Sequence, residues 1–322
     1  MQNVLVCGMA VADLVMQIPM LPDQADKYVA KDASWLLGGG GANAAVAMAR
    51  LGLRPVLLGR CGDDWVAGLI CNTLENEGVD CRGLLRTEGA DSSVSTVLVD
   101  QHGERQIINY RGRGLSSTPP AMKDLEPDSG KFHAVLTDTR WPDAALQALT
   151  HAHETGIPGV LDAEPALDER LLLKASHIAF SKEGLMECIG EFDINDRAEI
   201  TRALTLAQSK YGGWVGVTNG ADGSYFLSRV TTTGTDTANG PDPISNALLH
   251  HVSAFKVDVV DTLASGDIWH AAFTAKLAAA AVPGDAVRFA NAAAAIKCTR
   301  AGGGQGAPDL ESVESFLNQH DK

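Results

Sequence analysis

At 322 residues the chain is longer than one average domain, and a hydrophobic content of 45% with 20% charged residues is that of an ordinary soluble globular protein. The formal net charge of −14 argues against a nucleic-acid or anionic-membrane partner, because phosphate groups require a basic face. Small anionic ligands remain open, since they need only a local group of donors.

The N-terminal segment, MQNVLVCGMAVAD, has no basic region before its apolar run and predicts a first strand at residues 4–11 rather than a signal peptide. The longest apolar stretch, AAFTAKLAAAAV, is interrupted by Lys276 and is too short to span a bilayer. Six scattered cysteines without a paired spacing indicate reduced thiols. These features predict a cytoplasmic protein without a membrane partner.

Strand-like and helix-like runs then alternate along the chain, which is typical of a mostly parallel sheet covered on both faces. Further strands are expected at residues 55–60, 134–137, 158–162, 178–180 and 214–218. Helices are expected at residues 42–51, 65–77, 144–154, 196–209, 268–281, 286–300 and 309–318. We predict a single α/β domain over residues 1–322.

Two segments, residues 13–37 and 92–113, break this alternation with a period of two, and the second contains a His102-Gly103 turn like that of a hairpin. They predict a small separate sheet that covers the strand ends as a lid, with a pair of edge hairpins as the alternative. The polar loop at residues 231–246 has no role that the sequence reveals.

The stretch GGGGANAAVAMARLG begins at Gly38 and opens a helix. Its glycines let a ligand approach the backbone, and Asn43 offers both a donor and an acceptor at the helix start. A GxGxxA match from Gly39 to Ala44 would suit a dinucleotide fold, but that fingerprint should follow the first strand directly. A glycine-rich turn that serves only close packing is the alternative.

The stretch VVDTLASGDIWHAAF contains a turn of small residues before a helix, namely Ala264, Ser265 and Gly266. The first-turn N–H groups of a helix have no intrahelical partner, so small side chains leave them open to a phosphate. Asp267 would then lie beside the transferring group, where a carboxylate can accept a hydroxyl proton. A plain helix cap would have the same sequence.

Two later stretches have equally open interpretations. VTNGADGSYF follows a strand and has two turn glycines, which suits a nucleotide-contacting loop or an ordinary hairpin. RFANAAAAIKCTRAGGGQGAP is a small-residue helix that ends in a glycine run, which suits a flat ring or helix packing.

Together and in this order, the four stretches resemble the ribokinase/PfkB family of sugar kinases, and the resemblance covers residues 4–308. It implies a ribokinase-like, Rossmann-type α/β fold with a β-sheet lid, and ATP-dependent phosphorylation of a sugar hydroxyl with Mg²⁺. The family pattern Asp-Thr-x-Gly-Ala-Gly-Asp is matched at residues 261–267, with alanine and serine at the first two small positions. The resemblance therefore implies an anion hole at Ala264, Ser265 and Gly266 and a catalytic base at Asp267.

The resemblance also assigns the two ligands to residues. It implies nucleotide contacts at Thr218, Gly220, Gly223, Asn291 and Ala295. It implies sugar contacts at Asp13, Gly39, Gly40 and Asn43. The metal ligands stay unknown, because the family's Asn-x-x-Glu turn here reads Ser181-Lys182-Glu183-Gly184, where Glu183 could substitute through a water.

Six short segments are most similar to one branch of this family, the 6-deoxy-6-sulfofructose kinases: DKYVA, INY, DTRW, AFSKEGL, FKVDVVDT and KCTRAGG. That similarity implies a sulfonate held by Lys27, Asn109 and Arg140. A sulfonate is a permanent anion whose three oxygens are best met by charge-assisted donors. Each of the three residues also has a plain structural alternative. Arg111 and Arg113 could contact substrate or nucleotide, but they are expected to face water.

The resulting hypothesis is that ATP phosphorylates the C1 hydroxyl of 6-deoxy-6-sulfofructose, in a homodimer paired through the lid. Three alternatives remain open from the sequence. They are a kinase for another sugar or sugar acid (2-keto-3-deoxygluconate, fructose or ribose), a non-catalytic sugar-binding homologue, and a dinucleotide-dependent dehydrogenase.

Overall fold

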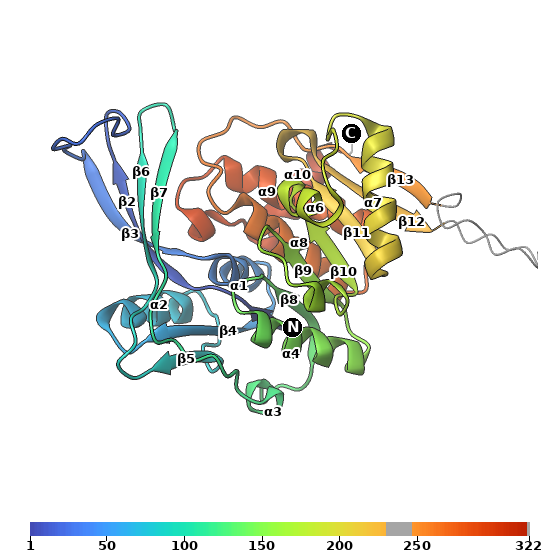
Figure 1. The fold of residues 1–322 in the computed structure, drawn as a ribbon, viewed down its shortest axis with the longest axis horizontal. Helices are drawn as coiled ribbons and strands as arrows, with labels where there is room; N and C mark the ends of the chain where they lie inside the picture. Colours follow the sequence, from blue (N-terminus) through green and yellow to red (C-terminus); the bar gives the residue numbers. More distant parts are fainter. Residues whose placement is uncertain (230–246, 321–322) are drawn as a thin grey trace, which may run out of the picture.

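A nine-stranded sheet forms the body of the protein in a computed structural model, which describes residues 1–229 and 247–320 (Figure 1). The predicted loop at residues 231–246 lies outside the described residues. The sheet order is β13-β12-β11-β10-β9-β8-β1-β4-β5, parallel from β11 to β5 and antiparallel at β12 and β13. The strands are β1 (Asn3–Cys7), β4 (Arg54–Gly62), β5 (Leu84–Thr87), β8 (Phe132–Thr137), β9 (Gly159–Ala163), β10 (His177–Phe180), β11 (Trp214–Thr218), β12 (Ser224–Arg229) and β13 (Ala247–Val252).

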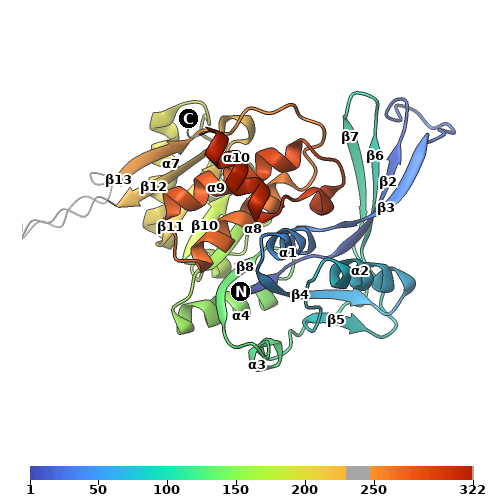
Figure 2. The same ribbon diagram turned by 180° about the vertical axis from the view of Figure 1, so that it is seen from behind.

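Helices cover both faces of this sheet, as the alternating pattern predicts, and each face has its own apolar core (Figures 1 and 2). One face carries α1 (Gly40–Arg50), α2 (Trp65–Asn76), α8 (Ser265–Ala278), α9 (Pro283–Cys298) and α10 (Leu310–His320). The other carries α4 (Pro142–Thr155), α5 (Glu169–Leu172), α6 (Lys182–Ile189) and α7 (Arg197–Tyr211), while α3 (Met122–Leu125) precedes β8. No helix within the described ranges is long and apolar enough to cross a membrane.

A second sheet of four strands stands apart from the body, beyond the carboxyl end of β1 (Figure 1). Its order is β3-β2-β6-β7, made of β2 (Val11–Gln17), β3 (Asp32–Gly38), β6 (Val94–Val99) and β7 (Arg105–Tyr110). The predicted hairpin is present between β6 and β7, where the N–H of Gly103 donates to the carbonyl of Asp100. The predicted α/β class, with a mostly parallel sheet covered by helices and a smaller separate sheet, is therefore confirmed.

The prediction of one strand over residues 4–11 is wrong. β1 ends at Cys7, and the chain leaves the body sheet through Gly8 and enters the lid sheet at Val11. A side chain at residue 8 would collide with the carboxylate of Asp138, at 2.4 Å from its Oδ2. The apolar run continues unbroken across this change of sheet, so its pattern cannot reveal it.

The remaining differences are short elements and helix starts. The elements not predicted are β5, α3, α5, α6 and the antiparallel edge strands, and α8 and α9 each begin three residues earlier than expected. VTNGADGSYF is a hairpin, with the 3₁₀ turn η1 (Gly220–Asp222) between β11 and β12; a second such turn is η2 (Gly303–Gly306). Edge strands of four to six residues carry too little periodicity to be recognised alone.

Candidate active site

A cavity of about 620 Å³ lies where β11, the N-terminus of α8 and α9 meet. Its lining includes all five residues to which the sequence assigned nucleotide contacts: Thr218, Gly220, Gly223, Asn291 and Ala295. The same wall includes Ser265 and Gly266 from the turn before α8, and the indole of Trp269. The cavity therefore joins a largely apolar compartment to a helix N-terminus. A nucleotide requires this arrangement, with its flat ring in the apolar part and its phosphates at the helix N-terminus.

The side chain of Asn291 is fully engaged within the protein. Its Oδ1 accepts from Ser224 Oγ at 2.9 Å and from Trp269 Nε1 at 2.7 Å. Its Nδ2 donates to the carbonyls of Val252 and Ser253 at 2.9 and 3.2 Å. Because an amide has two donors and two acceptor positions, Asn291 can shape this cavity but has no polar group left for a ligand.

The turn before α8 is held open by an unusual backbone angle. Ala264, its N-cap, has φ 64°, in the left-handed region that favours glycine. The N–H of Ser265 donates to the carbonyl of Thr262 at 3.2 Å, so it closes the turn. The N–H groups of Ala264 and Gly266 have no partner in the described part of the chain, so two of the three predicted anion-hole donors are open.

Asp267, in the first turn of α8, faces the first turn of α1. Its Oδ2 accepts a 2.7 Å hydrogen bond from Asn43 Nδ2, and a Cβ built on Gly40 would lie 3.4 Å from its Oδ1. Burial raises the pKa of the Asp267 carboxyl; the Asn43 hydrogen bond opposes this, and the charge of Glu164 adds to it. A pKa moved toward neutrality suits a carboxylate that accepts a hydroxyl proton.

Two further carboxylates, to which the sequence assigned no role, share a small cavity with Asp267. This cavity, with room for about one water molecule, is lined by Asp138, Asp162 and His270. Asp162 Oδ1 lies 3.4 Å from His270 Nε2 but has no hydrogen-bond partner among the described residues. Burial, then the charges of Glu164, Asp267 and Asp138, raise the pKa of Asp162 well above its usual value.

The position of Asp162 was visible in the sequence as the last residue of the predicted strand 158–162. In a parallel sheet, the carboxyl end of each strand faces the ligand crevice. Their position at the end of this strand therefore indicates Asp162 and Glu164 as candidate site residues, although neither lies in a recognised motif.

A second cavity, of about 480 Å³, lies between the carboxyl ends of the body strands and the base of the lid. Three guanidinium groups line it, those of Arg60, Arg111 and Arg140. Arg111 was expected to face water, with a contact to substrate or nucleotide as the alternative; its side chain is exposed and also borders this cavity beside Gly112 from the lid. The cavity is positively charged although the protein as a whole is acidic.

The three arginines differ in their partners. Arg60 lies over the ring of Trp141, with 4.9 Å from Cζ to the ring centroid, and donates to the carbonyl of Ser116. Arg140 forms a 2.9 Å ion pair with Glu164. Arg111 contacts the sulfur of Met9 and has no carboxylate within ion-pair distance among the described residues. Its charge is therefore the one most available to an anionic ligand.

The lid places two predicted sugar contacts in one row. Asp13 on β2 lies opposite Ser95 on β6, which in turn lies opposite Asn109 on β7. Ser95 Oγ donates to Asn109 Oδ1 at 2.8 Å. Burial raises the pKa of Asp13, and the neighbouring Ser95 hydroxyl opposes this. Asp13 and Asn109 thus share one face near the lid base.

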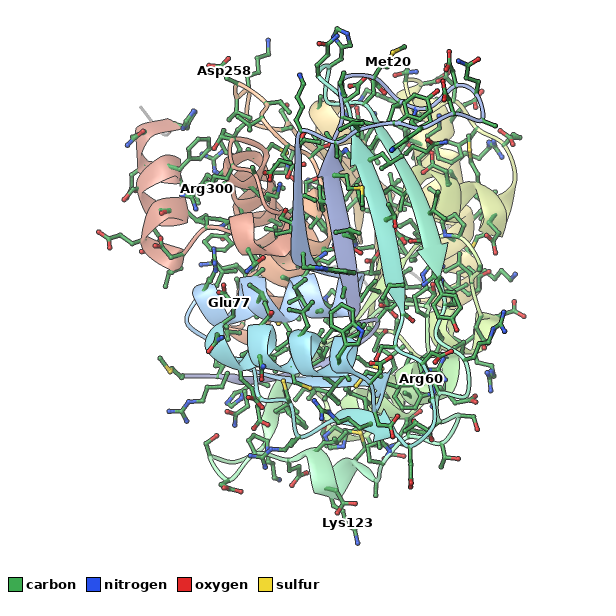
Figure 3. All side chains as sticks on the ribbon, turned by 90° about the vertical axis from the view of Figure 1, so that its left-hand side faces the viewer. Met20, Arg60, Glu77, Lys123, Asp258 and Arg300 are labelled. Carbon is green, nitrogen blue, oxygen red and sulfur yellow. The ribbon has the colours of Figure 1, made fainter. Side chains whose placement is uncertain are left out.

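Lys27 lies elsewhere. It belongs to the loop between β2 and β3, the loop at the far tip of the lid that also contains Met20 (Figure 3), and its side chain is exposed. Asn109 and Arg140 are both near the lid base, so this structure does not bring Lys27 together with them.

The turn at the predicted magnesium position is closely packed. Ser181 caps α6, with its Oγ accepting from the N–H of Gly184 at 3.0 Å. A Cβ on Gly184 would lie 1.9 Å from the carbonyl oxygen of Ala163. A glutamate has no room at residue 184, so this turn offers packing and a cap in place of the family's Asn-x-x-Glu.

Comparison with known proteins identifies the chain's relatives. The sequence pattern of the pfkB family carbohydrate kinases matches residues 1–310. Ribokinase of Schizosaccharomyces pombe is 26% identical over 99% of this chain and 98% of its own. An ATP-dependent ribose-1-phosphate kinase of Halopiger xanaduensis is 28% identical over 99% of both. The crystal structure of a putative ribokinase from Agrobacterium tumefaciens superposes with a TM-score of 0.82 at 30% identity, over 100% of this chain and 99% of that one.

Proposed function

Because this chain belongs to the pfkB family of carbohydrate kinases, whose members transfer a phosphoryl group from ATP with Mg²⁺, we propose that it phosphorylates a sugar that carries an anionic group. The substrate proposed is 6-deoxy-6-sulfofructose, phosphorylated at its C1 hydroxyl. The whole chain is proposed to work as one unit, with the lid closing on the sugar.

The observation that carries this proposal is the charge of the 480 Å³ cavity. Three guanidinium groups line it, and Arg111 has no carboxylate partner among the described residues. A neutral sugar would leave the charge of Arg111 without a partner, whereas a sulfonate offers three acceptor oxygens to the guanidinium groups. The ribose-1-phosphate kinase among the relatives is named for a sugar that is itself an anion.

Asp267 stands between the two cavities. On one side, its chain neighbours Ser265 and Gly266 border the 620 Å³ cavity proposed for the nucleotide. On the other side, Asp267 shares the small cavity with Asp138, and the residues that follow Asp138 in the chain line the 480 Å³ cavity. In the proposed reaction Asp267 accepts the proton of the sugar hydroxyl while the open N–H groups of the turn steady the charge of the transferring phosphoryl group. Asn43 orients the Asp267 carboxylate.

Bound Mg²⁺ neutralises charge on the nucleotide phosphates. Magnesium in kinase sites is held by one or two carboxylates plus phosphates and water, so a full cage of side chains is not needed. Among the described residues, no three His, Cys, Asp or Glu side chains are placed to hold a metal ion together, but Asp162 offers a buried oxygen without a hydrogen-bond partner beside other negative charges. The donor set therefore fits Mg²⁺, with Asp162 as the residue proposed to hold it.

The homodimer is proposed to form through the lid face that lies opposite the Asp13 row. The side chains of Trp35 and Ile108 on that face are 41% and 63% exposed. Sheets that leave such apolar side chains in water mark interaction surfaces. Sedimentation equilibrium of an Ile108→Lys variant tests this, with a shift from dimer to monomer expected.

The test of function is release of ADP from MgATP with a panel of 6-deoxy-6-sulfofructose, fructose, fructose 6-phosphate, ribose and 2-keto-3-deoxygluconate. A kcat/KM for sulfofructose well above every other sugar is expected. Preference for ribose, the sugar in the name of the Schizosaccharomyces pombe relative, would keep the kinase and reject the anionic substrate. Sugar binding without any ADP release would identify a non-catalytic sugar-binding protein.

A further inference from the structure

The ammonium group of Lys297 lies inside the protein. The side chain of Lys297, in the last turn of α9, is 0% exposed, and its stem packs against Gly306, where a Cβ would lie 3.2 Å from Lys297 Cδ. Burial of an ammonium is costly unless its charge is balanced and its N–H groups find acceptors. Lys297 Nζ donates to Asp261 Oδ2 at 3.0 Å, to the Asp261 carbonyl at 2.9 Å and to the Arg300 carbonyl at 3.1 Å. All three N–H groups are therefore used.

The two segments that supply these acceptors both lead to the active site. Asp261 begins the turn before α8, where its Oδ1 accepts from the N–H of Leu263 at 2.8 Å. Arg300 begins the loop that contains Gly304, where a Cβ would lie 2.4 Å from Asn43 Oδ1. The Lys297 ammonium thus connects the turn before α8, which has the open N–H groups, to the loop that packs on Asn43, the hydrogen-bond partner of Asp267.

A second cation contacts Asp261 from the lid. Arg105 on β7 lies 3.7 Å from Asp261 Oδ1 and also hydrogen bonds to Thr262 Oγ1. Arg105 reaches the turn from outside, whereas Lys297 holds it from within the core. The shape of the turn within the body therefore depends on Lys297.

We propose that Lys297 is a positioning residue that serves as a built-in monovalent cation for the turn at residues 261–266. An ammonium held at 2.9–3.1 Å by a carboxylate and two carbonyls has the surroundings of a bound ammonium or potassium ion. The role in turnover rests on the proposed kinase function, but the effect on phosphate binding does not require the correct sugar. It follows that the natural protein needs no added monovalent cation, and that removal of the side chain creates such a need.

The experiment measures MgADP binding by titration calorimetry in KCl, NH₄Cl and tetramethylammonium chloride at equal ionic strength. The natural protein is expected to give the same Kd in all three salts. Lys297→Ala is expected to bind about 10- to 100-fold more weakly in tetramethylammonium chloride, as for loss of other supporting contacts in sites, and to recover most of that loss in NH₄Cl or KCl. Lys297→Met, whose apolar chain refills the space, is the matched control and is expected to show no recovery.

The outcomes separate the two proposals. If folded Lys297→Ala does not regain MgADP affinity in KCl or NH₄Cl, the positioning role is overturned. The same holds if Lys297→Met regains affinity to an equal extent. If Lys297→Ala does not fold, the Kd of the natural protein for MgADP is compared between KCl and tetramethylammonium chloride. Binding that is tenfold or more tighter in KCl overturns the proposal, and equal Kd values support it. Binding of MgADP without turnover of any sugar rejects the proposed function alone, and failure to bind MgADP in any salt rejects both.

Discussion

Asn43 and Asp267 lie 224 positions apart in the chain, and a 2.7 Å hydrogen bond from Nδ2 to Oδ2 joins them. Each stands in the first turn of its helix, α1 and α8 respectively, so two helix N-termini converge on one carboxylate. Positive ends of two helix dipoles favour an ionised group there. Burial acts in the opposite direction on the pKa of Asp267 and outweighs the hydrogen bond.

The first prediction concerns the carboxylate itself. Asp267→Asn is expected to lower kcat by about 10²- to 10⁴-fold, the usual effect of losing a positioned general base, while MgADP affinity changes little. Steady-state ADP release and calorimetry measure the two quantities. Asp143→Asn, at an exposed carboxylate on α4, is the charge-matched control and should retain full turnover. Near-full activity of Asp267→Asn would contradict its role as the base.

The second prediction concerns pH. The general base must be ionised, so activity should fall as pH drops through the raised pKa of Asp267. The Asn43 hydrogen bond lowers that pKa, so Asn43→Ala should move the acidic limb of the kcat profile to higher pH. An unmoved limb would show that this hydrogen bond does not set the pKa of the base.

The third prediction concerns the buried negative charge at Asp162. Its pKa is raised in the folded state, so the loss of stability from Asp162 is complete above that raised pKa, shrinks as pH falls below it, and disappears only near the ordinary pKa of an aspartate. Asp162→Asn should therefore raise the melting temperature at neutral and alkaline pH, with a gain that shrinks on acidification. The same variant should need more Mg²⁺ for half-maximal turnover. A lower melting temperature at neutral pH would sink this account.

The fourth prediction concerns the backbone at Ala264. A left-handed φ of 64° costs a non-glycine residue about 1 kcal/mol or somewhat more, and glycine costs the unfolded chain up to about 1 kcal/mol in entropy. Ala264→Gly should therefore leave the free energy of unfolding nearly unchanged. Ala264→Val, with a branched side chain in the same backbone conformation, should lower it clearly. Urea denaturation measures both, and equal stabilities of the two variants would argue against strain at this turn.

The fifth prediction concerns the anionic end of the sugar. Arg111→Ala should raise the KM for sulfofructose at least about tenfold, the effect of losing one charge-assisted contact, with little change in kcat. Arg113, two residues further along, lies over the ring of Tyr110 and does not line the cavity, so Arg113→Ala is the matched control. Equal KM values for the two variants would remove Arg111 from the sugar site.

Sequence patterns pointed to residues that line the 620 Å³ cavity and to the turn at Ala264–Asp267, because both are built from short contiguous stretches. The five nucleotide candidates, drawn from two separate stretches, line one cavity. The hairpin of the lid was equally local, since its turn and both strands follow one another. Motifs of this kind carry their geometry within a few residues.

Features that depend on distant contacts were not predictable. Asn291 was expected to contact the nucleotide, but contacts with residues from three other segments occupy its amide. Lys297 attracted notice only as part of KCTRAGG, although its place on the same helix face as Ala290 and Ala293 already indicated burial. Lys27 was grouped with Asn109 by resemblance, and the lid separates them along its length.

The strand order of the lid has a consequence for how the protein folds. β2 pairs in parallel with β6, and Ala12 lies opposite Val94. These two residues are separated in the chain by the segment that contains α1, β4, α2 and β5. Pairing residues so far apart in the chain costs conformational entropy for closing the loop between them. The contacts between β2 and β6 offset that cost only after the intervening segment has packed. The lid should therefore be the last part to form and the first to open, with the fastest amide exchange among the strands. A mutation that weakens the body should then reduce sugar binding before it unfolds the protein.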